Sequence, residues 1–316
     1  MSPDNTPPDL AYRPRLADLQ PLVTPASSAP ATLRPAAEPR VTPAGQLQNR
    51  TGYDSRFLGD FVVPWPGFAA DPAHAPYPTG TPDHRLDYTH FSITMSVPRR
   101  LAIVVGVNID GAHSVELPRG RDAWAYDGRL PEDAQVGEEL YADNLLDRGH
   151  LVRRQDPNWG PDAQVANNDT FHFTNCSPQM AAFNQKTWLE LEDYILDNTR
   201  RWKARATIFS GPVLQDDDPT YRGVQIPKAF WKVVAYLGDN GKPSASAYTI
   251  DQRGELGNLE LVFGALRTYQ RSVTQIQALT GINFGALADY DGFSNEERLT
   301  GNRLQTVIRG PEDIRV

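Results

Sequence analysis

A histidine with charged neighbours and a distant amide–carboxylate pair are the residues in this chain best suited to chemistry. Asp147-Arg148-Gly149-His150 forms one run, and Asn184 and Glu192 follow eight positions apart. A base, an oxygen ligand for a hard metal ion and nearby guanidinium groups are the parts that metal-assisted phosphodiester cleavage requires. We therefore take these two stretches as the candidate catalytic centre.

His150 is the candidate general base. A neutral imidazole near pH 7 can take a proton from an attacking water. Gly149 permits close approach beside the ring, and Asp147 and Arg148 can fix the local geometry. A single histidine is more often structural, and we assign structural or surface roles to His84, His90, His113 and His172.

Asn184 and Glu192 are candidates for a metal site on one helix. Asn184, Trp188 and Glu192 lie at four-residue steps, so they share one side of a helix. An amide oxygen suits Mg²⁺, which keeps several waters and needs few protein ligands, and a nearby carboxylate can hold a metal-bound water. The alternatives are a plain helix cap for Asn184 and a solvated side chain for Glu192.

Arg121 and Arg148 are the basic residues near the motif in sequence. Either could neutralise the phosphate during cleavage. The alternative for both is a surface salt bridge.

The bulk properties exclude several classes. A chain of 316 residues with a formal charge of −8 is not a protein that coats nucleic acid through its overall charge, although a local basic groove is compatible with that total. The single Cys176, which we expect to be buried, excludes an intramolecular disulfide and a multi-cysteine zinc site. We expect no transmembrane helix and no secretory signal peptide, which is compatible with the cytoplasm and with export by a non-classical route.

The composition divides the chain into a tail and one domain. Residues 1–48 hold ten of the 27 prolines and many small residues, which predicts a disordered Pro/Ala-rich tail or linker. An alternative is that this segment docks a partner. We expect residues 49–316 to form one compact α+β domain.

The elements that must position the candidate residues follow from residue patterns. Residues 89–96 and 101–109 predict a hairpin, 170–176 predicts a strand, and 230–236 should pair with 245–250. A helix is predicted from about Asn184, with a buried stripe at Trp188, Leu191, Ile195 and Trp202. A second helix is predicted over 269–280.

At these residues the chain resembles the DNA/RNA non-specific endonuclease family of the ββα-metal superfamily, which includes the endonuclease G and Serratia nuclease types. The Asp-Arg-Gly-His signature stands at 147–150, and the helix pattern stands at Asn184, Gln185, Trp188, Leu191 and Glu192. The runs Phe173–Gln179 and Ser210–Pro212 also match, so four motifs stand in order over roughly 85–310.

The resemblance implies a ββα-metal fold, with a central antiparallel sheet flanked by helices. It implies that His150 is the general base, that Asn184 alone binds Mg²⁺ directly (with Mn²⁺ as a substitute), and that Glu192 holds a metal-bound water. Arg121 would contact the scissile phosphate, Asp147 and Arg148 would support the site, and Arg148 and Gln185 would contact the substrate. The substrates would be DNA and RNA without sequence preference, and homodimers are common in the family.

The chain departs from the family at one position. Some members carry a second phosphate-binding arginine one helical turn after the glutamate, where this chain has Leu196. Arg200 or Arg201 could substitute. Two further readings remain: a catalytically silent nuclease-fold protein that binds partners through its tail, and a toxin or defence effector that requires an inhibitor.

Overall fold

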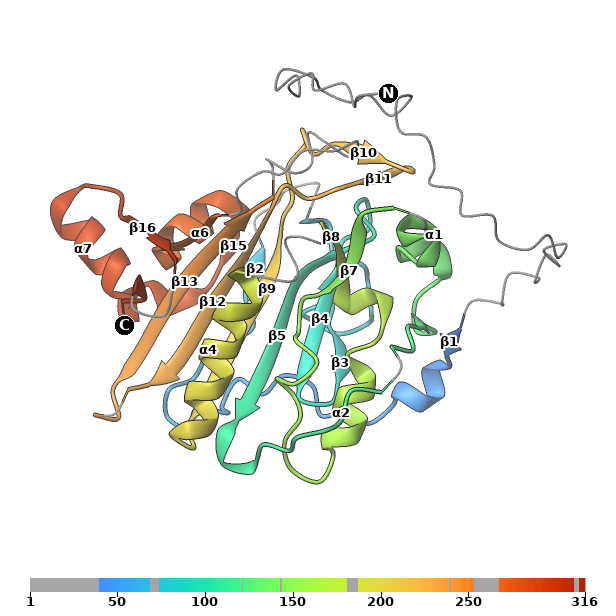
Figure 1. The fold of residues 1–316 in the computed structure, drawn as a ribbon, viewed down its shortest axis with the longest axis horizontal. Coiled ribbons are helices and arrows are strands. Elements are labelled where there is room, and N and C mark those ends of the chain that lie inside the picture. Colours follow the sequence, from blue (N-terminus) through green and yellow to red (C-terminus); the bar gives the residue numbers. More distant parts are fainter. Residues whose placement is uncertain are drawn as a thin grey trace, which may run out of the picture.

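The fold is built on an eight-stranded antiparallel sheet (Figure 1). The computed structural model describes residues 40–68, 74–120, 122–142, 144–180, 187–238, 240–252, 267–309 and 313–315, with backbone only at 187–191 and 267. The strand order is β16-β14-β13-β12-β9-β5-β4-β3. The strands are β3 (Leu86–Tyr88), β4 (Phe91–Met95), β5 (Ala102–Asp110), β9 (Arg205–Val213), β12 (Ala229–Leu237), β13 (Pro243–Asp251), β14 (Arg267–Arg271) and β16 (Gln305–Ile308).

Both faces of this sheet are covered by apolar cores, because successive side chains of a strand point to opposite faces. From β12, Phe230 and Val234 enter one core, whereas Trp231 and Val233 enter the other. All four side chains are at least 96% buried. A sheet enclosed on both faces gives rigid positions for any side chain at its surface.

The first face carries the candidate catalytic segments. Helix α4 (Thr187–Arg201) lies across it, and Leu196 of this helix packs into the first core (Figure 1). A separate two-stranded antiparallel sheet of β7 (Leu146–His150) and β8 (Cys176–Met180) packs into the same core, with α1 (Glu138–Tyr141) against β7 and α2 (Ala163–Asp169) in the connection between the two strands. The second face is covered by α6 (Val273–Thr280), η7 (Gly285–Tyr290) and α7 (Gly292–Thr300).

Short elements connect these layers. The two-residue strands β1 (Val41–Thr42) and β6 (Tyr126–Asp127) pair in parallel, and β2 (Gly67–Phe68) pairs with β15 (Ile282–Asn283). A small hairpin joins β10 (Thr220–Tyr221) to β11 (Val224–Gln225). The remaining 3₁₀ turns are η2 (Ala44–Leu47), η4 (Gly111–His113), η5 (Glu132–Ala134) and η6 (Phe173–Asn175). None of the helices in the described ranges is long and apolar enough to cross a membrane.

The structure confirms the main sheet pairings. β4 pairs with β5, and β12 pairs with β13 across the predicted turn. The α+β class with a central antiparallel sheet and flanking helices is therefore correct. Cys176 is a buried free thiol, as expected.

Four local predictions are wrong. Residues 173–175 form a 3₁₀ turn, so the strand predicted over 170–176 begins only at Cys176. The helix predicted over 269–280 begins at Val273, because Ser272 caps it by accepting a hydrogen bond from Gln275 N, and the residues before it continue the sheet as β14. Trp202 is 64% exposed rather than buried, because α4 ends at Arg201. Residues 40–48, assigned to the tail, contain β1 and η2, and Leu47 of η2 is 3% exposed.

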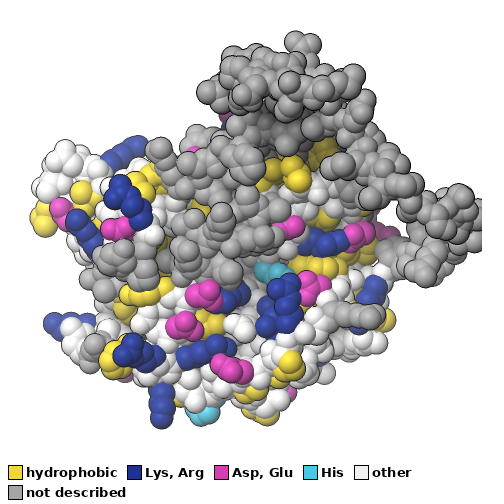
Figure 2. All heavy atoms as spheres, viewed as in Figure 1, with side chains coloured by type: hydrophobic (Ala, Val, Ile, Leu, Met, Phe, Trp, Pro, Cys, Tyr) yellow, Lys and Arg dark blue, Asp and Glu magenta, His cyan; other side chains and the backbone are white. Residues whose placement is uncertain are grey.

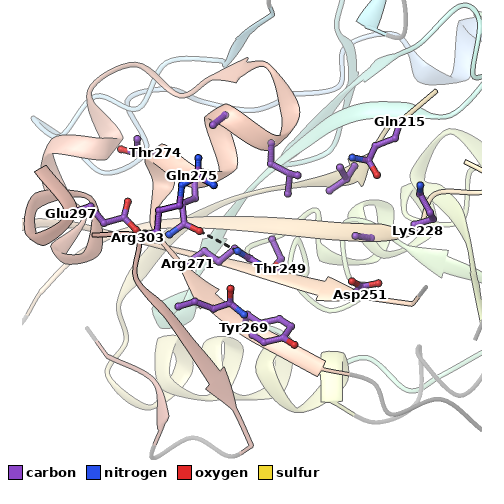
Figure 3. Close-up of a pocket in the computed structure, with 15 residues that line it drawn as sticks. Gln215, Lys228, Thr249, Asp251, Tyr269, Arg271, Thr274, Gln275, Glu297 and Arg303 are labelled. Atoms are coloured by element: carbon purple, nitrogen blue, oxygen red, sulfur yellow. Dashed lines mark hydrogen bonds between the residues drawn. The ribbon is translucent and has the colours of Figure 1, made fainter. Parts of the chain in front are cut away.

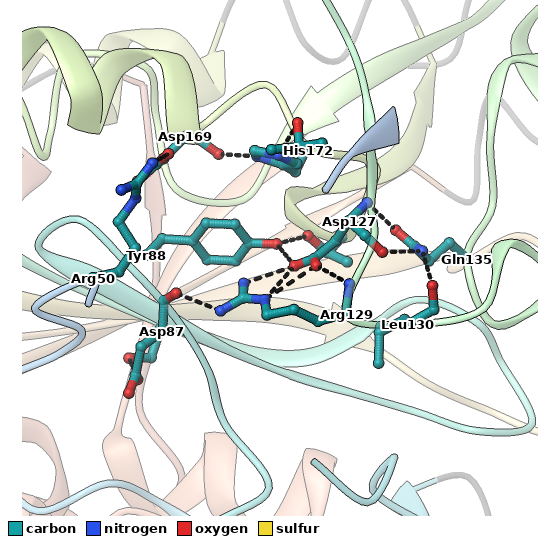
Figure 4. Close-up of polar contacts among 12 residues, drawn as sticks. Arg50, Asp87, Tyr88, Asp127, Arg129, Leu130, Gln135, Asp169 and His172 are labelled. Atoms are coloured by element: carbon teal, nitrogen blue, oxygen red, sulfur yellow. Dashed lines mark hydrogen bonds and ion pairs between the residues drawn. The ribbon is translucent and has the colours of Figure 1, made fainter. Parts of the chain in front are cut away.

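A buried polar network holds the loops on the first face (Figure 4). Asp127 accepts hydrogen bonds from Tyr88 Oη at 2.5 Å and from Arg129 Nη2 at 2.7 Å. Gln135 Oε1 accepts a hydrogen bond from Asp127 N at 2.9 Å, and Gln135 Nε2 donates one to the Asp127 carbonyl at 3.0 Å. Nearby, Arg50 Nε donates to Asp169 at 2.9 Å and thereby fastens the N-terminal described segment. The segments around the β7–β8 pair are therefore fixed by buried polar groups that have hydrogen-bond partners.

Candidate active site

His150 ends strand β7, where it stands opposite Cys176 of β8. Two aromatic rings enclose the imidazole: the Trp124 centroid is 4.7 Å away and the Phe171 centroid is 5.1 Å away. Its Nε2 atom is buried and has no hydrogen-bond partner in the part of the chain that the structure describes. Burial lowers the pKa of His150 to about 4; Arg119 and Arg154 add to the shift, and Asp122 opposes it. The ring is therefore neutral at pH 7 and can accept a proton.

Gly149 is required by the side chain of Gln179. A Cβ atom at position 149 would lie 2.0 Å from Gln179 Cδ, which no real contact allows. The Gln179 side chain thus fills the space that the glycine leaves, and it is 1% exposed. Neither its Oε1 nor its Nε2 has a hydrogen-bond partner among the described residues. In the sequence, Gln179 stood out only as the last residue of the Phe173–Gln179 match. The structure places its unpaired amide against Gly149 of β7.

Asp147 and Arg148 occupy opposite sides of β7, because adjacent strand residues alternate. Arg148 Nε lies 3.0 Å from Glu138 Oε2 on α1, and its guanidinium lies over the Tyr141 ring. Asp147 stands opposite Gln179 in the strand register. The structure therefore gives Arg148 a carboxylate partner on α1, and a role in substrate binding would require that ion pair to open.

Glu192 of α4 faces the sheet and meets a buried lysine. Lys232 Nζ lies 3.0 Å from Glu192 Oε1 and 3.0 Å from Ser210 Oγ. The Lys232 side chain is 1% exposed and that of Glu192 is 11% exposed. A buried ammonium group is stable only with such a partner. Sequence reasoning missed Lys232, since its neighbours in the chain are the apolar residues of a central strand.

A charged layer connects the loop after β7 to α4. Arg153 forms an ion pair with Asp193 of α4 and lies close to Glu192 and Asp156. Asp156 is 4% exposed, and burial raises its pKa to about 7, with Glu192 adding to the shift and Arg153 opposing it. Through Arg153, the segment that follows His150 is fastened to the helix that carries Glu192. These two candidate residues therefore lie on the same face of the sheet.

Three of the predicted site residues, Arg121, Asn184 and Gln185, lie outside the described residues. The neighbours of position 121 are informative: Arg119 and Asp122 both act electrostatically on His150. Trp124, three positions further on, contacts its ring. The chain on both sides of position 121 is therefore close to the candidate base.

Leu196 and the two arginines after it have separate environments. Leu196 is 1% exposed and belongs to the core, so its apolar character serves packing. Arg200 Nε donates to Ser114 Oγ at 2.8 Å, and Arg200 Nη2 is buried without a described partner. The Arg201 guanidinium lies over the Trp202 ring. Arg200 faces the segment after η4, whereas Arg201 is at the helix end.

A cavity of about 430 Å³ lies on the other face of the sheet (Figure 3). It is bounded by β13, β14, α6 and α7, and contains none of the candidate catalytic residues. Its carboxylate Glu297 accepts hydrogen bonds from Ser272 Oγ, Gln275 Nε2 and the Leu304 backbone. That acid is occupied in holding α6 to α7.

The described residues include no group of three or more His, Cys, Asp or Glu side chains that could hold a metal ion. A carboxylate-rich metal cage is thus excluded within the described ranges. Glu192 Oε1 makes an ion pair but no hydrogen bond with a described residue, so it retains the capacity to accept one from a water molecule. This donor chemistry fits a hydrated Mg²⁺ held through few protein groups.

The fold resembles that of a known nuclease. The crystal structure of the EndoG/EndoGI complex matches with a TM-score of 0.51 and 17% sequence identity, over 66% of this chain and 87% of that chain. At this identity the likeness concerns the fold alone.

The family model described as DNA/RNA non-specific endonuclease matches residues 71–291. This chain therefore belongs to the DNA/RNA non-specific endonuclease family, as its motifs predicted. Among curated proteins, the uncharacterized protein y4fB of Sinorhizobium fredii is 39% identical over 90% of this chain. Mitochondrial endonuclease G is 28% identical over 35% of this chain in both Bos taurus and Homo sapiens. The matches span 47% of the y4fB sequence and 40% of endonuclease G.

Proposed function

We propose that this protein is a Mg²⁺-dependent endonuclease that hydrolyses phosphodiester bonds of DNA and RNA without sequence preference. Family membership supports the reaction class, and the state of His150 carries the proposal. Its buried Nε2 has no described partner, and its depressed pKa keeps the ring neutral. A structural histidine of this kind would be expected to use both ring nitrogens.

In the proposed reaction, His150 Nε2 accepts the proton of a water molecule as that water attacks phosphorus. The rings of Trp124 and Phe171 fix the imidazole plane, so the base keeps one orientation. Gln179, held against Gly149, offers an open amide beside the same strand. Contacts mainly to phosphate and sugar account for the lack of sequence preference.

The metal would be held by Asn184, with Glu192 accepting a hydrogen bond from a metal-bound water and Lys232 fixing the Glu192 carboxylate. When bound, Mg²⁺ would stabilise the charge that develops on the leaving group. Arg121 would neutralise the scissile phosphate from the segment that borders His150. Arg148 and Asp147 would support the strand, and Gln185 would contact the substrate.

Digestion of plasmid DNA and of structured RNA, with Mg²⁺, with Mn²⁺ and with EDTA, tests this function. We expect cleavage of both substrates with either metal and none with EDTA. His150→Ala should lower kcat by roughly 10² to 10⁴-fold, as expected for loss of a general base. Asn184→Ala should abolish activity.

His113→Ala is the matched control, because the His113 side chain is 66% exposed and pairs with Asp110 at 3.0 Å. It should retain full activity. Unchanged activity in His150→Ala would remove His150 as the base. Purified protein that binds no Mg²⁺ and cuts neither substrate would favour a silent nuclease-fold protein that acts through binding.

The biological role and the partners beyond nucleic acid stay predictions. The EndoG/EndoGI structure shows an inhibitor on a protein of this fold, and we extend that to this chain only as a proposal. The proposed toxin or defence role would require such an inhibitor. Light scattering tests a homodimer, and deletion of residues 1–39, which leaves β1 and η2 in place, tests a docking function for the N-terminal segment.

A further inference from the structure

Three arginines, Arg119, Arg153 and Arg154, form one basic group, and two of them lie close to His150. Arg119 and Arg154 both act electrostatically on His150, and Arg119 and Arg153 both act on Arg154. On the face of the molecule that carries α4, Figure 2 shows a histidine side chain near the centre with both basic and acidic side chains around it. Two of the three arginines have carboxylate partners: Arg119 pairs with Asp122 at 2.9 Å, and Arg153 pairs with Asp193.

Arg154 differs from the other two because neutral oxygens hold it. Its Nη1 donates to Asn167 Oδ1 at 2.9 Å and to the Leu117 carbonyl at 3.4 Å. Among the described residues no carboxylate forms an ion pair with it. Burial and the repulsion of Arg119 and Arg153 lower the pKa of Arg154, and Asp122, which pairs with Arg119, opposes them only from a distance.

The groups that hold Arg154 are themselves fixed. Asn167 of α2 is 8% exposed and its Oδ1 also accepts from Asn158 Nδ2 at 3.3 Å. The loop that supplies the Leu117 carbonyl is fastened by Val115 N to the Asn158 carbonyl at 2.7 Å. One nitrogen of the guanidinium is thus anchored on two segments, and Nε and Nη2 donate no hydrogen bond to a described residue. A preorganised guanidinium of this kind is suited to a phosphate.

Arg153 and Arg154 are adjacent but diverge. Arg153 reaches α4, which carries Glu192, whereas Arg154 reaches α2 and the loop that contains Leu117. A phosphate bound by Arg154 therefore lies on the α2 side of His150, away from the Glu192 side. This placement is the one expected for a phosphodiester that neighbours the attacked one along the strand.

We propose that Arg154, with Arg119 beside it, forms a subsite for a neighbouring, uncleaved phosphodiester of the substrate strand. This inference rests on the proposed nuclease function. It assigns a positioning role that depends on substrate length: a strand with several phosphates uses the subsite, and a dinucleotide with one phosphodiester cannot.

The test compares wild type, Arg154→Gln and Arg154→Lys on a single-stranded oligonucleotide and on a dinucleotide, across roughly 50 to 200 mM salt. For the oligonucleotide we expect Arg154→Gln to raise KM about tenfold and to reduce the slope of log(kcat/KM) against log[salt] by about 0.7, the value for one lost contact on a single strand. For the dinucleotide, kcat/KM should change less than about twofold. Arg154→Lys keeps the charge and should recover the salt slope, which a purely structural role would not predict.

Arg298→Gln is the matched control, because this arginine of α7 is 59% exposed and forms an ion pair with Asp289 of η7. It should leave both substrates and the salt slope unchanged. If wild type cleaves but Arg154→Gln keeps the wild-type slope, or loses activity equally on both substrates, the subsite is overturned and the proposed function stands. If wild type cleaves neither substrate, the proposed function fails and the subsite fails with it. Should Arg154→Gln not fold, Arg154→Met takes its place in the same comparison, with the same supporting and contrary results.

Discussion

Two polar regions on the same face of the sheet differ in whether their buried polar atoms have hydrogen-bond partners. Around Asp127, each charged or polar side chain meets a partner: Tyr88, Arg129 and Gln135 all donate to this residue. Around His150, several buried atoms have no partner within the described ranges. They are His150 Nε2, both polar atoms of the Gln179 side chain, Ser177 Oγ and Arg153 Nη1.

We propose that this difference separates buried polar groups that serve the fold from those that a ligand would complete. Burial alone would raise the pKa of Asp127, but hydrogen bonds from Arg129 and Tyr88 outweigh it and hold that pKa below its usual value. At His150 burial prevails, and the pKa falls to about 4. An unpaired buried group destabilises the folded state, so a cluster of them indicates a site that substrate, metal or water completes.

Breaking the closed network should have the largest effect. Asp127→Asn leaves Arg129 without its charged partner at a site where the Asp127 side chain is 0% exposed. We expect the free energy of unfolding to fall by about 3–5 kcal/mol, measured by urea denaturation. Activity per folded molecule should stay within about twofold of wild type. A loss below about 1 kcal/mol would mean that the network does not stabilise the fold.

Lys232→Met tests whether the buried ion pair belongs to the site. Without Lys232, the Glu192 carboxylate loses the group 3.0 Å away that fixes it. Loss of a group that orients a metal's supporting residue lowers metal affinity by about 10- to 100-fold, which calorimetric titration with Mg²⁺ would measure. Lys232→Met combined with Glu192→Gln should recover stability but not Mg²⁺ binding. Unchanged Mg²⁺ affinity in Lys232→Met would place Lys232 among the purely structural groups.

The pH dependence of kcat/KM distinguishes the buried His150 from a histidine with an ordinary pKa. His150 acts as a base only when neutral, so activity persists as the pH falls until it approaches the pKa of about 4. At saturating Mg²⁺, kcat/KM should change less than about twofold between pH 7 and 5.5. A histidine with an unshifted pKa of about 6.5 would lose about tenfold over this range. An acid limb near pH 6.5 would contradict the burial that the structure shows.

An exposed ion pair should have the smallest effect. Arg298 and Asp289 lie 2.9 Å apart with both side chains more than half exposed. Asp289→Asn should change the free energy of unfolding by less than about 1 kcal/mol, because solvent screens such pairs. Thermal denaturation measures the change, and a loss comparable to that of Asp127→Asn would remove burial as the cause of the difference between the two regions.

The sequence predicted the elements that depend on local patterns. The hairpin of β4 and β5 and the pairing of β12 with β13 follow from alternating apolar residues around turns. The strand predicted over 170–176 failed because three of its residues form a 3₁₀ turn, whose backbone is set by hydrogen bonds to the loops around it. Helix α6 begins later than predicted because Ser272 caps it and the residues before Ser272 form strand β14, which pairs with β13.

By itself the sequence determined the family, the α+β class and the identity of the candidate base, because the signature residues 147–150 are contiguous and the helix pattern from Asn184 to Glu192 has a fixed period. Only the tertiary structure decided how these residues are supported. Lys232 meets Glu192 from forty positions away because the register of β12 with β9 sets it opposite Ser210, beneath α4. The pairing of β7 with β8 brings Gln179 into the space at Gly149. Arg154 is held by Asn167 of α2 and by the Leu117 carbonyl. Such contacts join residues that no local pattern relates, so the packing of the elements alone fixes which polar groups are paired and which stay open.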